Sequence, residues 1–480
     1  MQLKRKEELK DFLKTFRTKS FGVIVLIVAL TMVLTLTTKA DFLIKTDKES
    51  YIDAINLLAS LLASIVATVY SITIVALQLA STQFSPRILR YFLSNNTYNQ
   101  ITLGVFLGWV VFCLLLKFWL IDAIPPEVSQ VPNSMKPILN LGIYGCIVLI
   151  GGLLPHFIIT IAESINAASI TRKITLHTIN EIYQSKEFWK HQEEIEKRPE
   201  HPNKVAVVSK KFGYLRSMNV NALRKISQKY PYIDFIEQVN DVGSYISQGM
   251  LLAYVAFQDR ASEREQRQIV ELVAKQFSVG KFRSYRQDIH FGLRQLVDIA
   301  LKAISPAVND PTTAINCLDY LGEIVKEILQ ADMPATGLTR WKGEKLYLNE
   351  ASFDRIVNQA FDQIYHYGRN DFAVTARLIN TITYCITHAK RIEHLDVITD
   401  EILEIGLDFA YQYKNGNLSL VHSQEQLLRI FKILQRSIVT LNQRYQTLGV
   451  ETFLEEDKIK LLQNRCKQYI KEIEEKLKDL

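Results

Sequence analysis

Charged and polar side chains of several kinds gather between residues 283 and 310, within a region whose pattern is mostly helical. Arginine, aspartate, glutamine and one histidine occur close together, and this mixture could bind an ion or a small anion. The same charges could instead form ion pairs that join a β-rich segment to the next helix, so both interpretations remain. The candidate residues are Arg283, Arg286, Gln287, Asp288, His290, Arg294, Asp298, Asn309 and Asp310.

Two helices are expected to carry these residues. Apolar residues at helical spacing between Phe291 and Leu301 predict an amphipathic helix. Ser305 and Pro306 interrupt that pattern. Asp310 has the residue type of an N-cap, and Pro311 suits the first position of a second helix. The sequence therefore predicts a tight corner between two helices, which by itself accounts for Asn309, Asp310 and Pro311.

A second group of polar residues carries no charge and follows one side of the apolar segment 54–79. Their spacing of three, four or seven residues places them along one helix face. Small and hydroxyl residues of this kind allow close helix packing in lipid. Alternatively, several copies could surround a water-filled pore, with Arg87 and Arg90 at its inner mouth. The stripe begins with Asn56 and Ser60, and its candidate pore-lining members are Ser64, Thr68, Ser71, Gln78, Thr82 and Ser85.

Motifs of common catalytic and cofactor sites are not found in the sequence. It has no P-loop, no dinucleotide glycine motif, no H-E-x-x-H and no G-x-S-x-G. The nine histidines do not cluster, and none of the five cysteines forms a C-x-x-C pair. The net charge of +7 is concentrated beside apolar segments, which favours membrane orientation over nucleic-acid binding. We expect no enzyme activity, no cofactor, no bound metal and no nucleic-acid partner.

Four apolar segments in the first 165 residues are long enough to cross a bilayer as helices, which takes about 20 residues each. The segments that flank these spans alternate between basic and near-neutral. The first of them, residues 1–20, contains seven basic and three acidic residues. By the positive-inside rule, both termini are expected in the cytoplasm. The predicted spans are residues 21–38, 54–79, 101–121 and 138–161.

The remaining two thirds of the chain is predicted to form a cytoplasmic α+β region. A helical extension and linker is expected over residues 166–203, and a small β-rich domain over 204–257. Gly243 and Gly249 precede an apolar strand there, as in small barrel-sandwich domains. Amphipathic patterns over 258–480 predict a helical bundle. The expected fold is thus a mainly α membrane protein, with a transmembrane domain over residues 1–165 and a cytoplasmic region that includes a barrel-like segment.

Two stretches, TVYSITIVALQLASTQFSPRILR (residues 68–90) and FGLRQLVDIALKAISPAVNDPTTA (residues 291–314), resemble the hallmark sequences of a bacterial family. This family of predicted membrane proteins is called domain of unknown function 2254, and the resemblance covers nearly the whole chain. It implies a bacterial inner-membrane protein and implies no activity. The matching positions, without assigned roles, are Gln78, Ser85, Pro86, Arg87, Gln295, Asp298, Ser305, Pro306, Asn309, Asp310, Pro311 and Thr313.

Two functions agree with these features. The first is a homo-oligomeric channel or pore, lined by the second span and assembled or gated by the cytoplasmic region. The second is a membrane-anchored sensor or scaffold, in which the cytoplasmic region binds a ligand or partner and the spans serve as the anchor. The expected partners are the lipid bilayer, further copies of the chain and a small ion or ligand.

Overall fold

The computed structural model describes residues 47–83, 97–418, 421–450 and 455–478. The chain divides into two compact units, residues 1–169 and 170–480. The first predicted span, together with Ser85, Pro86, Arg87 and Arg90, lies outside the described residues.

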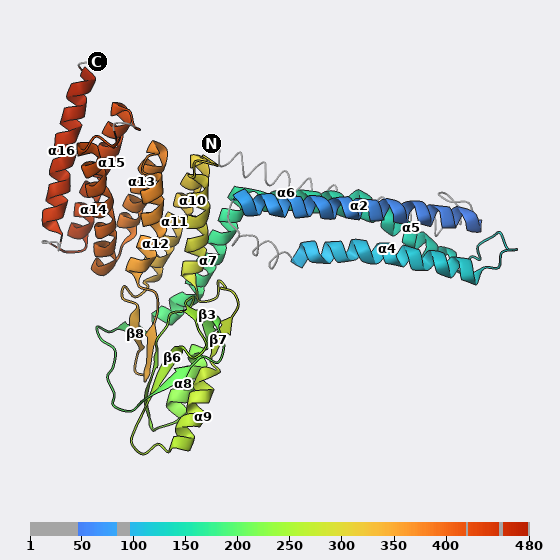
Figure 1. Ribbon diagram of the computed structural model, residues 1–480, viewed down its shortest axis with the longest axis horizontal. Coiled ribbons are helices and arrows are strands. Elements are labelled where there is room, and N and C mark those ends of the chain that lie inside the picture. Colours follow the sequence, from blue (N-terminus) through green and yellow to red (C-terminus); the bar gives the residue numbers. More distant parts are fainter. Residues whose placement is uncertain (1–46, 84–96, 419–420, 451–454, 479–480) are drawn as a thin grey trace. The chain divides into compact units, whose positions relative to one another are not determined.

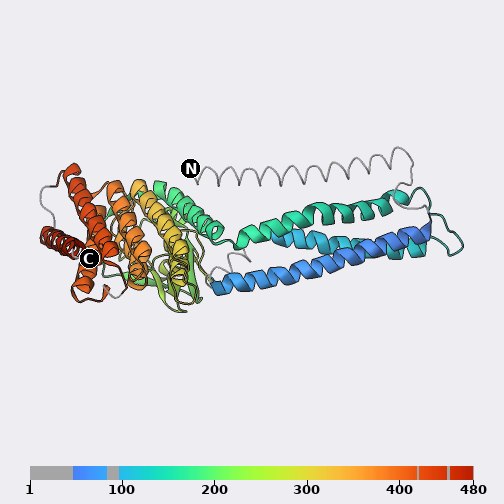
Figure 2. The same ribbon diagram turned by 90° about the horizontal axis from the view of Figure 1, so that it is seen from above.

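Three helices of the N-terminal unit are long and apolar enough to cross a membrane: Lys48–Val75, Gly104–Ala123 and Lys136–Thr160. They coincide with the second, third and fourth spans predicted from the sequence, and they lie side by side in both views (Figures 1 and 2). The elements of this unit are α2 (Lys48–Gln83), α4 (Thr97–Ala123), α5 (Lys136–Val148), the π-helix η1 (Leu149–Leu153) and α6 (Leu154–Ile165).

Two glycines of α5 allow close contact with α4. A Cβ at Gly145 would lie 1.8 Å from the Trp109 ring, and a Cβ at Gly142 would lie 2.7 Å from the Leu116 side chain. Trp109 Nε1 donates a hydrogen bond to the Gly142 carbonyl at 3.0 Å. Small residues thus bring the helices together, as is common in lipid. The wider π-helical turn of η1 directly precedes Pro155, whose ring cannot follow a regular α-helical turn.

The helix that follows the last span is a separate element, although the sequence predicted a continuous extension. Asn166 has an extended backbone (ψ 124°), and its side-chain oxygen accepts a hydrogen bond from the Ala168 amide at 2.9 Å. This is the local hydrogen bonding by which asparagine interrupts one helix and starts another. Helix α7 (Ala167–Trp189) begins there.

Two open sheets form the α+β part of the C-terminal unit, in place of the predicted small barrel. The six-stranded sheet has the order β1-β8-β9-β4-β6-β2, and the three-stranded sheet has the order β5-β3-β7. The strands are β1 (Gln192–Glu194), β2 (Lys204–Val208), β3 (Gly213–Met218), β4 (Ile233–Gln238), β5 (Tyr245–Ile246), β6 (Leu251–Phe257), β7 (Phe277–Gly280), β8 (Leu338–Trp341) and β9 (Leu346–Asn349).

Four of these strands lie outside the segment 204–257 in which the strands were expected. Strand β1 comes from the predicted linker, while β7, β8 and β9 come from the region predicted to be a helical bundle. Strand β9 pairs in parallel with β4, from more than 100 residues earlier in the chain. Such pairing depends on tertiary contacts, and the short strands involved leave little periodicity to recognise.

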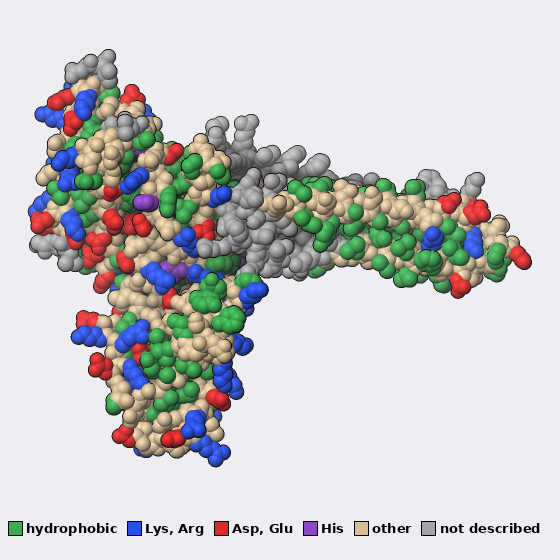
Figure 3. Space-filling view, in the orientation of Figure 1, with side chains coloured by type: hydrophobic (Ala, Val, Ile, Leu, Met, Phe, Trp, Pro, Cys, Tyr) green, Lys and Arg blue, Asp and Glu red, His purple; other side chains and the backbone are tan. Residues whose placement is uncertain are grey.

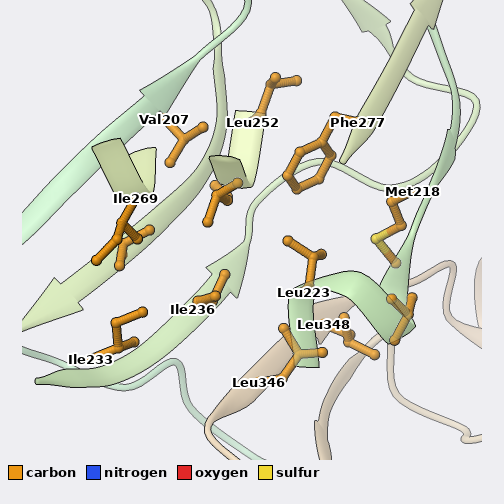
Figure 4. Packing of buried hydrophobic residues seen from close by; sticks show 14 of the residues in the cluster. Val207, Met218, Leu223, Ile233, Ile236, Leu252, Ile269, Phe277, Leu346 and Leu348 are labelled. Carbon is orange, nitrogen blue, oxygen red and sulfur yellow. The ribbon is translucent and has the colours of Figure 1, made fainter. Parts of the chain in front are cut away.

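The hydrophobic core of this part lies between the sheets and two helices, α8 (Val220–Lys229) and α9 (Glu263–Ala274). It brings together Val207 from β2, Leu223 from α8, Ile269 from α9 and Leu346 from β9, all essentially inaccessible to solvent (Figure 4). Segments from four separate parts of the sequence therefore bury a common apolar surface, which is the main favourable contribution to folding.

The helices of the C-terminal unit stack in two rows, so that each pair packs on the next (Figure 1). One row holds α10, α12, α14 and α16, and the other holds α11, α13 and α15. The prediction of a mainly helical region is confirmed, and its arrangement is an array of helix pairs, as in helical-repeat proteins. The helices are α10 (Ile289–Ala303), α11 (Pro311–Ala331), α12 (Phe353–Gly368), α13 (Phe372–His388), α14 (Ile392–Lys414), α15 (Gln424–Thr447) and α16 (Glu456–Lys478).

Candidate functional site

A cavity of about 340 Å³ lies in the C-terminal unit, where the sheets meet α7 and the N-terminal end of α10. Its walls are both polar and apolar, and they include four of the residues predicted as a polar site. The lining residues include Glu181, Phe188 and Trp189 of α7, Gln238 of β4, Asp241, Arg286, Gln287, Asp288, His290 and Glu350.

Asp288 is the N-cap of α10 and one half of a mostly buried ion pair. It is 3% exposed, and its Oδ1 accepts a hydrogen bond from the Phe291 amide at 3.0 Å. Arg283 donates to both carboxylate oxygens, at 2.8 and 2.7 Å. Burial raises the pKa of Asp288, whereas Arg283 and the Phe291 amide act to lower it. A cap and a two-bond ion pair thus fix the start of α10 at the cavity.

Gly243 makes room for this ion pair. A Cβ at that position would lie 2.6 Å from both Arg283 Nη2 and Asp288 Oδ2, and the backbone φ of +96° is one that L side chains rarely adopt. The sequence suggested Gly243 as part of a barrel turn. In the structure it allows the loop before β5 to approach the start of α10.

Gln287 has the left-handed backbone conformation, with φ of 57°, and is held on two sides. Its side chain accepts from the Met218 amide at 2.9 Å and donates to the Met218 carbonyl at 3.1 Å. Its backbone amide donates to Glu181 Oε1 at 2.7 Å. These contacts join β3 and α7 at the cavity wall and support a conformation that is costly for a residue with a Cβ.

His290 is buried in the cavity wall, and its two ring nitrogens have different surroundings. Gln359 Nε2 donates to the His290 carbonyl at 2.8 Å, so its Oε1, 2.6 Å from His290 Nδ1, is the acceptor. Nδ1 therefore carries the proton, and Nε2 keeps its lone pair. Within the described chain Nε2 has no hydrogen-bond partner. Burial lowers the pKa of His290 to about 4, so the ring is neutral at pH 7.

Glu350 adds a carboxylate that no Lys or Arg side chain neutralises among the described residues. Trp189 Nε1 donates to its Oε2 at 3.0 Å, and Gln192 donates to its Oε1 at 2.9 Å. Burial raises the pKa of Glu350, and these two hydrogen bonds oppose the rise. Asp241, which also lines the cavity, is paired, because it accepts a hydrogen bond from Arg355 at 2.6 Å.

The other predicted polar-site residues lie in helix contacts. Arg294 pairs with Asp298 one turn later on α10 at 2.8 Å and also donates to Gln363 of α12. Asn309, with φ of 49°, precedes Asp310, which caps α11 by accepting from the Thr313 amide at 3.1 Å. The predicted corner and N-cap are thus present in the structure. The ion-pair interpretation describes Arg283 with Asp288 and Arg294 with Asp298, and the binding interpretation stays a prediction.

Sequence reasoning missed the cavity residues outside the 283–310 segment. Glu181 and Trp189 come from α7, Gln238 from β4 and Glu350 from the end of β9. Each is a single residue in a segment with an ordinary helix or strand pattern, more than 40 residues from Asp288. No local pattern in the sequence marks Glu350 as a cavity residue, because its role depends on which strands and helices pack around it.

The polar stripe of α2 lies opposite the face that packs against the other described helices. Tyr51, Ile55, Leu62 and Val66 are buried against α4 and α5, and they occupy one side of α2. The stripe residues Ser60, Ser64, Thr68, Ser71 and Gln78 are exposed in the described structure. These stripe residues therefore do not pack against α4, α5 or α6, as the prediction of close helix packing would require for these helices. Thr82 lies near the end of α2.

No three His, Cys, Asp or Glu side chains are grouped so that they could hold a metal ion, as far as the described ranges extend. The cavity is instead lined by His290 and by several carboxylates, beside aromatic side chains. Its chemistry suits the binding of a small organic molecule that donates hydrogen bonds.

Comparison with known proteins identifies relatives but no activity. A family described as "Predicted membrane protein (DUF2254)" matches residues 16–384. Uncharacterised proteins of Mycobacterium tuberculosis and Mycobacterium bovis are each 28% identical over 356 residues, which cover 71% of this chain and 66% of each relative. The chain thus spans just under two thirds of the length of these curated relatives. No solved structure matches it. The match over most of the sequence, together with three helices able to cross a bilayer, shows that this chain belongs to the DUF2254 family of predicted membrane proteins.

Proposed function

We propose that this protein is a membrane-anchored sensor whose C-terminal unit binds a small molecule in the cavity at the start of α10. The observation that carries the proposal is His290 Nε2, a buried acceptor without a partner in the described chain, on a side chain that lines the cavity. Leaving such a group unsatisfied costs about 1–3 kcal/mol. A ligand that donates a hydrogen bond to this nitrogen would remove that cost.

The ligand class follows from the charges of the cavity wall. Asp241 and Asp288 are neutralised by Arg355 and Arg283, whereas Glu181 and Glu350 have no Lys or Arg partner within the described ranges. Arg286 adds one cation to the lining, against the two acids Glu181 and Glu350. On balance the acceptors favour a ligand that is neutral or cationic and carries N–H or O–H donors. Phe188 and Trp189 provide aromatic surface, which also attracts cations. The volume of about 340 Å³ is within the usual range for small-ligand pockets.

The orientation of the protein in the membrane determines the compartment from which such a ligand would bind. The positively charged first 20 residues support a bacterial inner-membrane protein with both termini in the cytoplasm. The C-terminal unit would then sample cytoplasmic metabolites. We propose binding without catalysis, with the membrane helices serving as the anchor.

Thermal unfolding of the full chain in lipid nanodiscs tests this proposal. Agmatine and adenosine serve as donor-bearing probes, and inorganic phosphate serves as an anionic contrast. A probe present at 100 times its Kd is expected to stabilise the folded unit by about 2.7 kcal/mol, seen as a rise in Tm. Failure of both donor-bearing probes to raise the Tm, or a larger rise with phosphate, would show that the proposed ligand class is wrong.

Two histidine variants make the test specific. In His290→Asn, the amide group takes the place of Nδ1 in the hydrogen bond to Gln359, but no atom replaces Nε2. The rise in Tm caused by the probe should therefore be lost. His366, which is exposed on α12, provides the matched control His366→Asn, and this variant should keep the full rise. An equal response from both variants would remove His290 from the binding site.

The exposed stripe of α2 supports a second candidate, a homo-oligomeric pore. Hydroxyl and amide side chains on the face opposite the helix contacts are costly against lipid but favourable beside water or another copy of the chain. Ser64, Thr68, Ser71 and Gln78 would line such a pore. Thr82 and Ser85 would continue the lining, and Arg87 and Arg90 would form its inner mouth.

Native mass spectrometry and bilayer recording test the pore together. We expect an oligomer that conducts, with Gln78→Leu lowering the conductance because it removes the polar side chain from the wall. Tyr70 is exposed on α2 outside the stripe, so Tyr70→Phe should leave the conductance unchanged. A monomer, or a conductance that Gln78→Leu does not alter, would contradict this candidate.

A further inference from the structure

Three segments of the α+β part carry charges of one sign only. Residues 204–218 contain four Lys or Arg, residues 275–287 contain another four, and residues 242–257 contain none. The three segments together have no Asp or Glu. The chain as a whole has 57 basic and 50 acidic residues, so eight basic residues without an acid are a marked local excess.

The fold brings one part of each segment into the three-stranded sheet, while residues 204–208 and 251–257 form β2 and β6 of the six-stranded sheet. They supply β3, β5 and β7, in the order β5-β3-β7, with Tyr214 opposite both Tyr245 and Gly280. On β3, the buried Gly213 and Leu215 alternate with residues that reach the surface. The surface of this sheet and its adjoining loops, here called the basic sheet face, consists of Lys211, Phe212, Arg216, Tyr245, Lys281 and Phe282.

Aromatic and basic side chains lie together on this face. Phe212 is 71% exposed and Tyr245 is 53% exposed, which is unusual for large apolar side chains. Lys281 Nζ lies 5.1 Å from the centre of the Phe282 ring. Figure 3 shows hydrophobic side chains bordered by Lys and Arg over β3 and β7. Exposed rings flanked by cations are typical of surfaces that meet a lipid headgroup layer.

The charges on this face are largely free to meet a partner. Lys204 and Arg283, from the same segments, are neutralised by Glu237 and Asp288. Lys211, Arg216 and Lys281 are exposed and form no ion pair with any described residue. A surface of this composition creates a positive potential, which attracts an anionic surface over about one Debye length, roughly 8–10 Å.

We propose that the basic sheet face docks onto an anionic lipid surface. The chain belongs to a membrane-protein family and has three helices able to cross a bilayer, so the C-terminal unit is tethered at a high effective lipid concentration. Aromatic side chains would enter the headgroup layer while the cations contact lipid phosphates. A nucleic acid would also attract the cations, but tethering favours the lipid.

A fluorescent label on the full chain in nanodiscs tests the proposal. All five native cysteines are buried, so Tyr245→Cys places a preferentially labelled site on the basic sheet face. Nanodiscs of phosphatidylcholine are compared with nanodiscs that also contain phosphatidylglycerol, each with brominated acyl chains as quencher. We expect quenching of several fold with the anionic lipid, little with phosphatidylcholine alone, and release as salt is raised.

Charge reversal identifies the residues responsible. Lys281→Glu should abolish the lipid-dependent quenching, whereas Lys467→Glu, the same change at an exposed position of α16, should retain it. Both side chains are exposed, and equal Tm values for the two variants confirm that folding is unaffected.

Several outcomes would overturn lipid docking. They are equal quenching in both kinds of nanodisc, equal effects of the two charge reversals, and shielding of the label that depends on protein concentration, which would indicate contact between copies. Displacement of the face from anionic nanodiscs by a short single-stranded oligonucleotide at low micromolar concentration would assign it to nucleic acid instead.

Discussion

Replacement of Asp288 by alanine is expected to lower the free energy of unfolding of the C-terminal unit by about 3–5 kcal/mol. The change removes the N-cap of α10, and it leaves the Arg283 guanidinium, whose side chain is 25% exposed, without its carboxylate. Breaking a mostly buried pair by deleting one partner is costly because the remaining charge stays desolvated. Urea unfolding of the purified chain, followed by tryptophan fluorescence of Trp189 and Trp341, measures the loss.

The matched control removes an ion pair that solvent already surrounds. Arg267 pairs with Glu263 one turn away on α9, and both side chains are more than 80% exposed. Arg267→Ala should therefore cost less than about 1 kcal/mol. Asp288→Asn distinguishes the effect of the N-cap from that of the ion pair, because asparagine still caps a helix but carries no charge. The decrease in its free energy of unfolding should therefore be intermediate. A loss for Asp288→Ala no larger than that for Arg267→Ala would show that the pair does not hold the cavity wall.

Lowering the pH from 7 to 5 is expected to destabilise the wild type more than His290→Asn, by about 2 kcal/mol. The pKa of His290 is lowered to about 4 in the folded state, mainly by burial, against an ordinary value of 6.5. Between these two values only the unfolded chain takes up the proton. Stability is therefore complete above about pH 6.5 and falls as the pH drops toward 4, with a total loss of about 3 kcal/mol.

The difference between wild type and variant is the informative quantity, because other groups titrate in the same range. Burial raises the pKa of Asp288 and Glu350, and a folded carboxyl with a raised pKa favours the folded state as the pH falls. Charged neighbours of His290 include Arg283, Arg355 and Asp241. These contributions are shared by wild type and His290→Asn. Parallel stability curves from pH 7 to 5 would contradict a neutral, buried His290.

The local features of the sequence predicted the elements that depend on neighbouring residues. Long apolar segments predicted the second, third and fourth spans, because a helix in lipid forms its backbone hydrogen bonds within itself. Asp310 and Pro311 gave the start of α11 and the corner before it, because capping and proline geometry act within one turn. The polar cluster at 283–290 could be recognised as a group because its charged residues and histidine are neighbours in the chain, and four of its members line the cavity.

Only the tertiary structure decided which residues meet around the cavity and how the strands pair. Glu181, Asp288 and Glu350 lie more than 60 residues apart along the chain, yet all line the same cavity. Strand β9 joins β4 from a region whose pattern is helical on both sides. Contacts at such separation are selected by the apolar surface that the whole unit buries together, and no local periodicity records them. The sequence by itself therefore determined three membrane helices, the Asp310 cap and the corner, whereas the cavity, the open sheets and the basic sheet face exist only because distant segments pack against one another.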